Sequence, residues 1–130
     1  MRKTIVFLVI HLALLGTLSA DNDAAHENEL KDLMPIIDDA TKSLDSNVAG
    51  QKGEAAAEDA KALEELLAKV EVYFVRKGDA AEAVAFAQKA QGLVSDVSKS
   101  VRGGDFDAAS GSIGSLVRSC KACHEAYRRD

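Results

Sequence analysis

The sequence is poor in proline, cysteine and aromatic residues, and each shortage narrows the range of structures it can form. Among its 130 residues Pro35 is the only proline, and no run alternates apolar with polar side chains as a half-buried strand does. The only 2 cysteines are Cys120 and Cys123, so neither has another cysteine with which to pair. Aromatic residues make up 5% of the chain, so its core has little bulk. Helices are the elements that remain, and we predict an all-α protein.

Glycines divide the chain after residue 24 into four segments, each long enough for several helical turns. We predict helices at about 24–48, 54–76, 79–101 and 105–127. Each has apolar residues at steps of three and four, which places them on one helix face. In chain order these faces are Leu30, Leu33, Met34, Ile37, Leu44 and Val48; Ala56, Ala60, Leu63, Leu67, Val70 and Phe74; Phe86, Ala90, Leu93, Val97 and Val101; and Phe106, Ala109, Ile113, Leu116, Cys120, His124 and Tyr127.

The helix ends and connections predict how the segments pack. Pro35 removes a backbone donor and crowds the preceding turn, so the first helix should kink or restart there. Asp79, which follows Gly78, is a good N-cap for the third helix, and the fourth should open at Asp105. Short connections favour antiparallel neighbours, which predicts an up-down-up-down four-helix bundle.

The start of the chain has the layout of a secretory signal peptide. Two basic residues precede an apolar run over 5–15, and Leu18-Ser19-Ala20 resembles a cleavage site. The run is short for a membrane span, although an uncleaved anchor is an alternative because Leu18 is bulky for its place. We expect residues 1–20 to direct export, and residues 21–130 to form the mature bundle without a stable membrane span. In a Gram-negative bacterium the protein would be periplasmic.

The charge of the mature chain limits its partners. Cleavage would remove Arg2 and Lys3 and no acidic residue, leaving 14 basic against 21 acidic residues, a net charge of −7. Such a chain repels a phosphate backbone, so we expect no nucleic-acid partner. The sequence has no paired carboxylates, nucleophile–base arrangement or phosphate loop, so it does not indicate an enzyme.

The most informative motif is Cys120-Lys121-Ala122-Cys123-His124, the Cys-x-x-Cys-His pattern of covalent haem attachment. Each thiol can add across one haem vinyl group, and the histidine can bind the iron. On a helix these three side chains share one face. The motif therefore predicts one haem c per chain, bound covalently by Cys120 and Cys123. His124 is the expected proximal iron ligand, on the core face near the end of the last helix.

Other roles of the cysteine pair are open. A redox dithiol of this spacing is expected beside a strand–helix pattern, which the chain lacks. A zinc site needs a fourth ligand in addition to Cys120, Cys123 and His124, and no obvious one is near in the sequence. A structural disulfide would make the adjacent histidine a coincidence. A haem-free helical protein with a dithiol switch is therefore the alternative from a different functional class.

With this motif in its last helix, the chain resembles the cytochrome c′ family. Those proteins have four antiparallel helices and Cys-x-x-Cys-His near the end of the last one. The segment 120–128 matches their common ending, including the aromatic Tyr127 and the basic Arg128. The resemblance implies that Arg128, one turn after His124, lies on the proximal side of the haem. It also implies redox proteins or diatomic gases as partners, and members often form homodimers.

Met34 relates the chain to one branch of this family. In the low-spin relatives, and in the similar b-type four-helix cytochromes, a methionine of the first helix completes the iron coordination, and Met34 matches that position. The resemblance then implies a one-electron carrier, because imidazole and thioether ligands raise the potential of the iron. His26 is another candidate sixth ligand. In cytochromes c′ proper an apolar residue blocks this side of a five-coordinate iron, which binds nitric oxide or carbon monoxide, and this is the alternative function.

Overall fold

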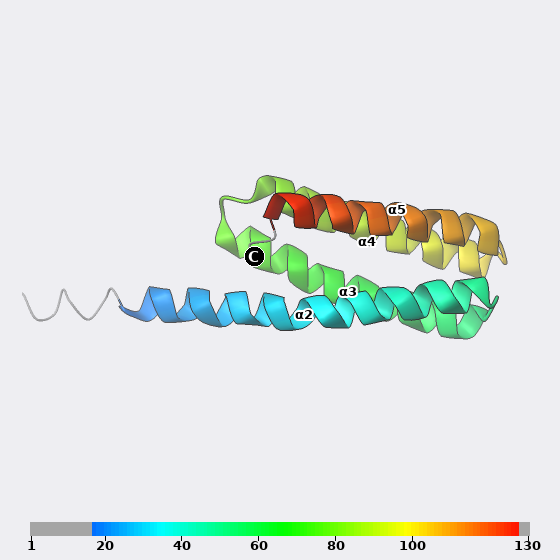
Figure 1. The fold of residues 1–130 in the computed structure, drawn as a ribbon, viewed down its shortest axis with the longest axis horizontal. Coiled ribbons are helices and arrows are strands. Elements are labelled where there is room, and N and C mark those ends of the chain that lie inside the picture. Colours follow the sequence, from blue (N-terminus) through cyan, green and yellow to red (C-terminus); the bar gives the residue numbers. More distant parts are fainter. Residues whose placement is uncertain (1–16, 128–130) are drawn as a thin grey trace, which may run out of the picture. The chain divides into compact units, whose positions relative to one another are not determined.

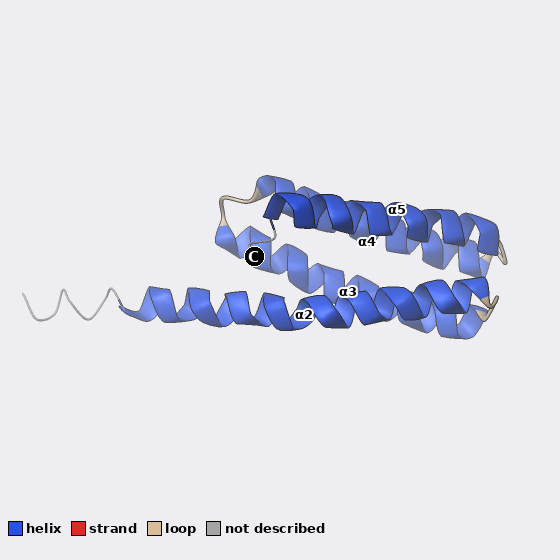
Figure 2. Cartoon of the chain, in the orientation of Figure 1, coloured by secondary structure: helices blue, strands red, loops and turns tan. Residues whose placement is uncertain are grey.

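The computed structural model describes residues 17–127, and this part of the chain is almost entirely helical. It forms α2 (Thr17–Ala49), α3 (Gly53–Lys77), α4 (Ala81–Arg102) and α5 (Phe106–Tyr127), joined by short turns (Figures 1 and 2). No strand occurs among these residues, so the all-α prediction is confirmed. A search of the described helices finds none with the length and apolar character needed to cross a membrane.

The chain divides into two compact units, residues 1–32 and residues 33–130, with the boundary inside α2. In the first unit the side chains described, those of residues 25–32, are exposed or half-buried. His26 belongs to this unit, and its Nδ1 lies 3.5 Å from Glu29 Oε2, one turn further along the helix. The candidate sixth ligand His26 is therefore a solvated side chain paired within its own helix.

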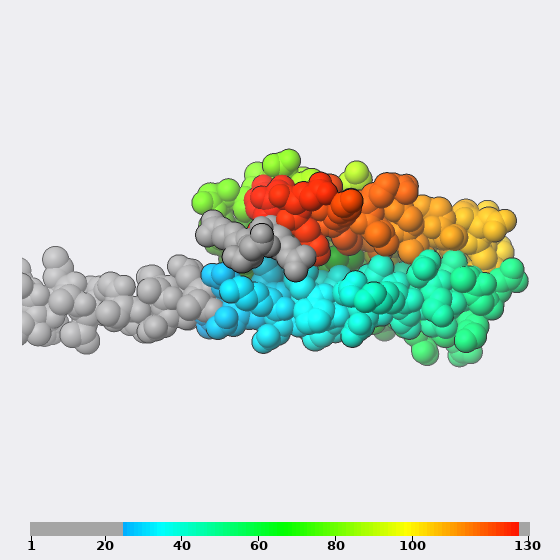
Figure 3. All heavy atoms as spheres, viewed as in Figure 1, coloured from blue at the N-terminus to red at the C-terminus, as the bar shows by residue number. Residues whose placement is uncertain are grey.

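The second unit contains the bundle. Residues 33–49 of α2 and the whole of α3, α4 and α5 alternate in direction, as predicted for an up-down-up-down arrangement (Figure 1). The closest backbone approaches are between α3 and α4 and between α4 and α5, where small alanine side chains line the contacts. On α2 the buried residues include the larger Leu44 and Val48. In the space-filling view the side chains of residues 33–49 of α2 adjoin those of α5 along this face (Figure 3).

The buried faces follow the predicted ones most closely in α3, where the buried residues are the six expected ones. The prediction for α4 is partly wrong. Phe86 and Leu93 are only half-buried, whereas Ala87 and Val94 are buried. The residues that α4 buries against its neighbours are mostly small side chains such as Ala83, Ala87 and Ala90, and not its largest apolar ones.

Of the two helix starts predicted at aspartate residues, one is confirmed. Asp105 Oδ1 accepts a hydrogen bond of 2.9 Å from the backbone N–H of Ala108, and therefore caps α5. The prediction for Asp79 is wrong, because α4 is preceded by Ala80 and no side chain caps it. Ala80 is 5% exposed, so burial of a small apolar side chain, and not a polar cap, holds this end of α4 in place.

The restart expected at Pro35 does not occur, because α2 is continuous through it. Pro35 is exposed, as is Lys31, whose carbonyl loses its usual donor. Water can hydrogen-bond to that carbonyl on the outer side of the helix. The residues that follow Pro35 therefore stay in one helix with Met34.

Candidate functional site

The motif residues lie in the last two turns of α5, and both ends of this helix are held in place. α5 is continuous from its Asp105 cap through the glycine- and serine-rich stretch 110–115. At its other end the ring of Tyr127 lies 5.8 Å from that of Phe74 on α3, and the Tyr127 hydroxyl lies 3.4 Å from Glu82 Oε2 on α4. Burial and the nearby Glu82 carboxylate raise the pKa of Tyr127, so it remains a neutral hydrogen-bond donor at neutral pH.

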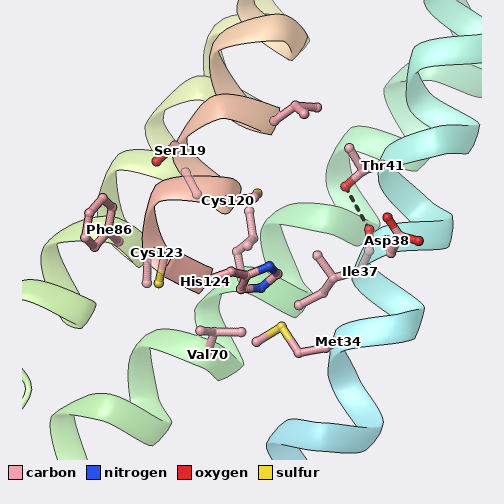
Figure 4. Close-up of a pocket in the computed structure, with 14 residues that line it drawn as sticks. Met34, Ile37, Asp38, Thr41, Val70, Phe86, Ser119, Cys120, Cys123 and His124 are labelled. Carbon is pink, nitrogen blue, oxygen red and sulfur yellow. Dashed lines mark hydrogen bonds between the residues drawn. The ribbon is translucent and has the colours of Figure 1, made fainter. Parts of the chain in front are cut away.

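Cys120, Cys123 and His124 line one pocket, as their helical spacing predicts (Figure 4). The pocket has a cavity volume of about 140 Å³ and takes residues from all four described helices. Most of its walls are apolar, with few polar groups, a composition typical of sites for flat organic cofactors. The apolar residues include Met34, Ile37, Leu67, Val70, Phe86 and Val117.

Met34 lies across this pocket from the motif. It is half-buried on α2, and its side chain and that of His124 point toward one another from the two helices (Figure 4). Ile37, one turn later on α2, is 7% exposed and lines the same wall. The Thr41 hydroxyl, at the edge of the pocket, donates a 2.7 Å hydrogen bond to the Ile37 carbonyl. A thioether and an imidazole therefore face each other across a largely apolar space.

The expectation that the motif lies on the core face holds only in part. Cys120 and Cys123 are half-buried, but His124 is exposed at the edge of the pocket. A step of four residues advances the helix face by about 40°, so the series Leu116, Cys120, His124 turns away from the core. The series through Ser119 and Cys123 alternates steps of three and four and stays closer to the core. Ser119, which was not among the predicted core residues, is accordingly buried.

Burial also controls the chemistry of the two thiols. It raises the pKa of Cys120, and a smaller contribution in the same direction comes from Asp38. Burial raises the pKa of Cys123 as well, and further contributions in the same direction come from repulsion by a Cys120 thiolate, when that thiol is ionised, and by Glu82. Both thiols are therefore protonated at neutral pH. Redox-active dithiols require the opposite, a lowered pKa that supplies the attacking thiolate.

The donor atoms in the pocket fit a haem and do not form a closed metal cage. Within residues 17–127, no group of three or more histidine, cysteine or acidic side chains could hold a metal ion. The pocket instead offers two thiols that can react with two vinyl groups, one imidazole and one thioether that can bind iron, and apolar walls for the ring. This set matches the chemical groups of haem c.

Two of the predicted site residues are not part of this pocket. Arg128 lies outside the residues that the structure describes. His26 belongs to the first unit of the chain and does not line the pocket. Other residues that were not predicted as part of the site also line it, among them Phe86 and Ser119. The three- and four-residue steps from Leu116 to Cys123 could have indicated Ser119, but only the packing of α4 reveals Phe86.

Comparison with known proteins agrees with this geometry. The family model described as cytochrome c′ matches residues 28–128, which include Met34 and the whole Cys-x-x-Cys-His motif. No curated protein and no solved structure matches the chain significantly.

Proposed function

The chain belongs to the cytochrome c′ family, and on this basis we propose that it is an exported monohaem c-type cytochrome that carries one electron at a time. The family is in general one of haem-binding and electron-carrying proteins, not of enzymes. We propose that Cys120 and Cys123 bind one haem c covalently and that His124 is its proximal iron ligand. When bound, the haem supplies an iron that gains and loses one electron.

The proposal of electron transfer depends above all on Met34. Its thioether faces the His124 imidazole from the opposite helix across the pocket (Figure 4). If a haem is bound, these two groups would complete the coordination of its iron, and the protein ligands would not need to rearrange when one electron enters or leaves. This pair of ligands also favours the reduced state and raises the potential. The chain's residues would then fix and tune the redox centre without binding a substrate.

The residues around the pocket also support a role in electron transfer. The apolar side chains of α2, α3 and α4 would exclude water from most of the ring. His124 is exposed, so that edge of the site is accessible to a redox partner protein. Arg128, one turn after His124, is proposed to lie on the proximal side, where its charge would oppose the oxidised, more positive iron.

We further propose that residues 1–20 are a signal peptide and residues 21–130 the mature protein in the periplasm. Members of the family are typically periplasmic. The basic start, the apolar run and the small residues near Ala20 support this division. The chemistry of the site agrees with it, since c-type haem is attached outside the cytoplasm.

Covalent attachment gives the first test, and it also separates this function from a haem-free dithiol switch. Denatured wild-type protein should keep its haem on the polypeptide during extraction with acidified acetone. The variants Cys120→Ala and Cys123→Ala should each yield much less mature protein, because one thioether bond is lost. Control variant Ser115→Ala, on the same helix but outside the pocket, should mature normally. Haem that passes into the organic phase from wild-type protein would contradict the proposal.

The absorption spectra of the oxidised and reduced protein test the iron ligands. Ligation by His124 and Met34 predicts a low-spin spectrum in both states and slow binding of carbon monoxide. The second candidate function, a gas-binding cytochrome c′ with five-coordinate iron, is favoured by one observation. Ile37 lines the same wall as Met34 and could cover the sixth position with an apolar side chain. A high-spin wild-type protein that binds nitric oxide or carbon monoxide rapidly would favour that function over electron transfer.

A further inference from the structure

Ser119 has a buried hydroxyl without a hydrogen-bond partner. The residue is 4% exposed, and among the described residues no group donates to or accepts from its Oγ. A buried polar atom without a partner costs free energy, so native structures rarely keep one without a reason. Ser119 lines the same pocket as the three motif residues.

Two other hydroxyls show how a helix normally satisfies such a group. Ser115 Oγ, one turn earlier on α5, donates a 3.1 Å hydrogen bond to the Gly111 carbonyl. Thr41 Oγ1, in the same pocket, donates a 2.7 Å hydrogen bond to the Ile37 carbonyl. Both bonds reach back four residues along their own helix. Ser119 does not make this bond, so its hydroxyl is free to serve a group in the pocket.

The surroundings of Ser119 leave few acceptors for this hydroxyl. On the α4 side of the pocket lie Phe86, Ala87 and Ala90, none of which has a polar side-chain atom. Cys123 lies four residues after Ser119 on the same face of α5, and in the close-up both side chains lie on the side of α5 where Phe86 stands (Figure 4). The polar atom of the pocket best placed for Ser119 is therefore the sulfur of Cys123.

We infer that the Ser119 hydroxyl is a positioning group that donates a hydrogen bond to the Cys123 sulfur once that sulfur is a thioether. This inference rests on the proposed covalent haem. When the Cys123 thiol adds across a vinyl group, its hydrogen goes to one vinyl carbon and its sulfur to the other, so no oxidant or reductant is needed. The sulfur then has no proton and can only accept. The carboxylates of haem are carried away from its vinyl groups, so a haem bound through its vinyl group at Cys123 would not bring them to Ser119.

This hydrogen bond has two consequences. It holds the second linkage in one rotamer, because the hydroxyl and the sulfur fix each other's χ1 angle. It also points the positive end of the hydroxyl dipole toward the ring edge, which favours the reduced, less positive iron. Ser119 would therefore both orient the attachment and raise the midpoint potential.

The experiment compares the haem-loaded wild-type protein with three variants. Ser119→Ala removes the hydroxyl, Ser119→Thr restores it, and Ser115→Ala removes a hydroxyl that is already bonded within the helix. We expect Ser119→Ala to keep covalent haem, to lower the midpoint potential and to shift the carbon–sulfur stretching band in the Raman spectrum. Ser119→Thr should return both values toward those of the wild type, and Ser115→Ala should change neither.

A measurement on the wild-type protein keeps the test decisive if Ser119→Ala fails to fold. Exchange into heavy water replaces the hydroxyl proton by deuterium, and a hydrogen bond to the sulfur predicts a shift of the same Raman band. Covalent haem together with an unmoved band, in heavy water and in Ser119→Ala, would overturn the role of Ser119 alone. Haem that is released on extraction would instead overturn the proposed function.

Discussion

At the scale of single residues, the replacement Met34→Ala separates ligation from packing. If the Met34 sulfur binds iron, this variant should convert the protein from low spin to high spin and speed the binding of carbon monoxide. The truncation of a half-buried methionine should also lower the free energy of unfolding by about 2 kcal/mol. The measurements are the absorption spectrum, rapid mixing with carbon monoxide, and unfolding by denaturant.

Ile37→Ala is the matched control for this experiment. Ile37 lines the same wall of the pocket, one turn from Met34, and it has no donor atom. Ile37→Ala should lower the free energy of unfolding by as much as Met34→Ala or more, and it should leave the iron low-spin. If both variants change the spin state alike, the effect comes from loosening of the pocket, and Met34 is not a ligand.

The sequence could predict the parts of the site that depend on local helix geometry. The convergence of Cys120, Cys123 and His124 follows from their spacing on one helix, and the structure brings them to one pocket. The meeting of Met34 with His124 follows from antiparallel topology, since the first helix of the bundle begins where the last one ends. The exposure of His124 and the burial of Ser119 could not be predicted as readily, because a rotation of α5 by a few tens of degrees decides both.

At the scale of helices, the predictions failed where a neighbour and not the sequence pattern decides burial. α3 buries one face, and its six predicted residues are the buried ones. α4 buries a row of mostly small residues instead, so its largest apolar residues, Phe86 and Leu93, were the wrong guide to its core. The start of α4 was also mispredicted. The buried Ala80 precedes this helix, and the side chain of Asp79 makes no capping hydrogen bond to it.

Two glycines provide a stability test at this scale. Gly111 lies within α5, is exposed, and a Cβ built there meets no atom within 4 Å. Gly111→Ala should therefore raise the free energy of unfolding by about 0.4–1 kcal/mol, because alanine loses less backbone entropy in a helix. Gly78 ends α3 with a φ of +84°, a conformation that L-residues rarely adopt.

Because alanine is strained at this positive φ, Gly78→Ala should lower the free energy of unfolding by about 1–2 kcal/mol. Urea unfolding followed by circular dichroism measures both variants against the wild type. Opposite signs for the two replacements are the expected result. A loss of stability in Gly111→Ala would mean that the serine- and glycine-rich stretch of α5 packs closely against another molecule in solution.

At the scale of the whole molecule, side-chain hydrogen bonds join neighbouring helices at three places among the described residues: the Tyr127–Glu82 contact between α5 and α4, and two contacts made by α3. Asp59 Oδ2 on α3 accepts hydrogen bonds from Ser43 at 2.8 Å and Asn47 at 2.7 Å, both on α2. Glu71 on α3 accepts hydrogen bonds of 2.7 Å from Gln88 and 2.6 Å from Gln91, both on α4. The pocket lies on the Met34 side of the Asp59 contact, where α2 makes no such bond among the described residues. The wall that carries Met34 is therefore attached to the bundle mainly by apolar contacts.

The Glu71 contact predicts a specific dependence of stability on pH. Hydrogen bonds from Gln91 and Gln88 lower the pKa of the Glu71 carboxyl below its ordinary 4.5, because they favour the charged form. The unfolded chain then binds the proton more readily than the folded one, so this contribution is fully present above about pH 4.5 and disappears as the pH falls through the folded-state pKa. Glu71→Gln should be less stable than the wild type at neutral pH, and the difference should shrink toward zero in acid.

Urea unfolding of the two proteins between pH 7 and pH 3 measures this difference, and effects of acid on the haem ligands cancel because both proteins share them. Glu65→Gln is the control, since Glu65 is an exposed glutamate on the same helix. It should show a smaller difference from the wild type at neutral pH. A Glu71→Gln difference that stays constant across this range would mean that the amides of Gln88 and Gln91 bind the protonated carboxyl of Glu71 as well as the carboxylate. In that case the contact between α3 and α4 depends on hydrogen-bond geometry and not on charge.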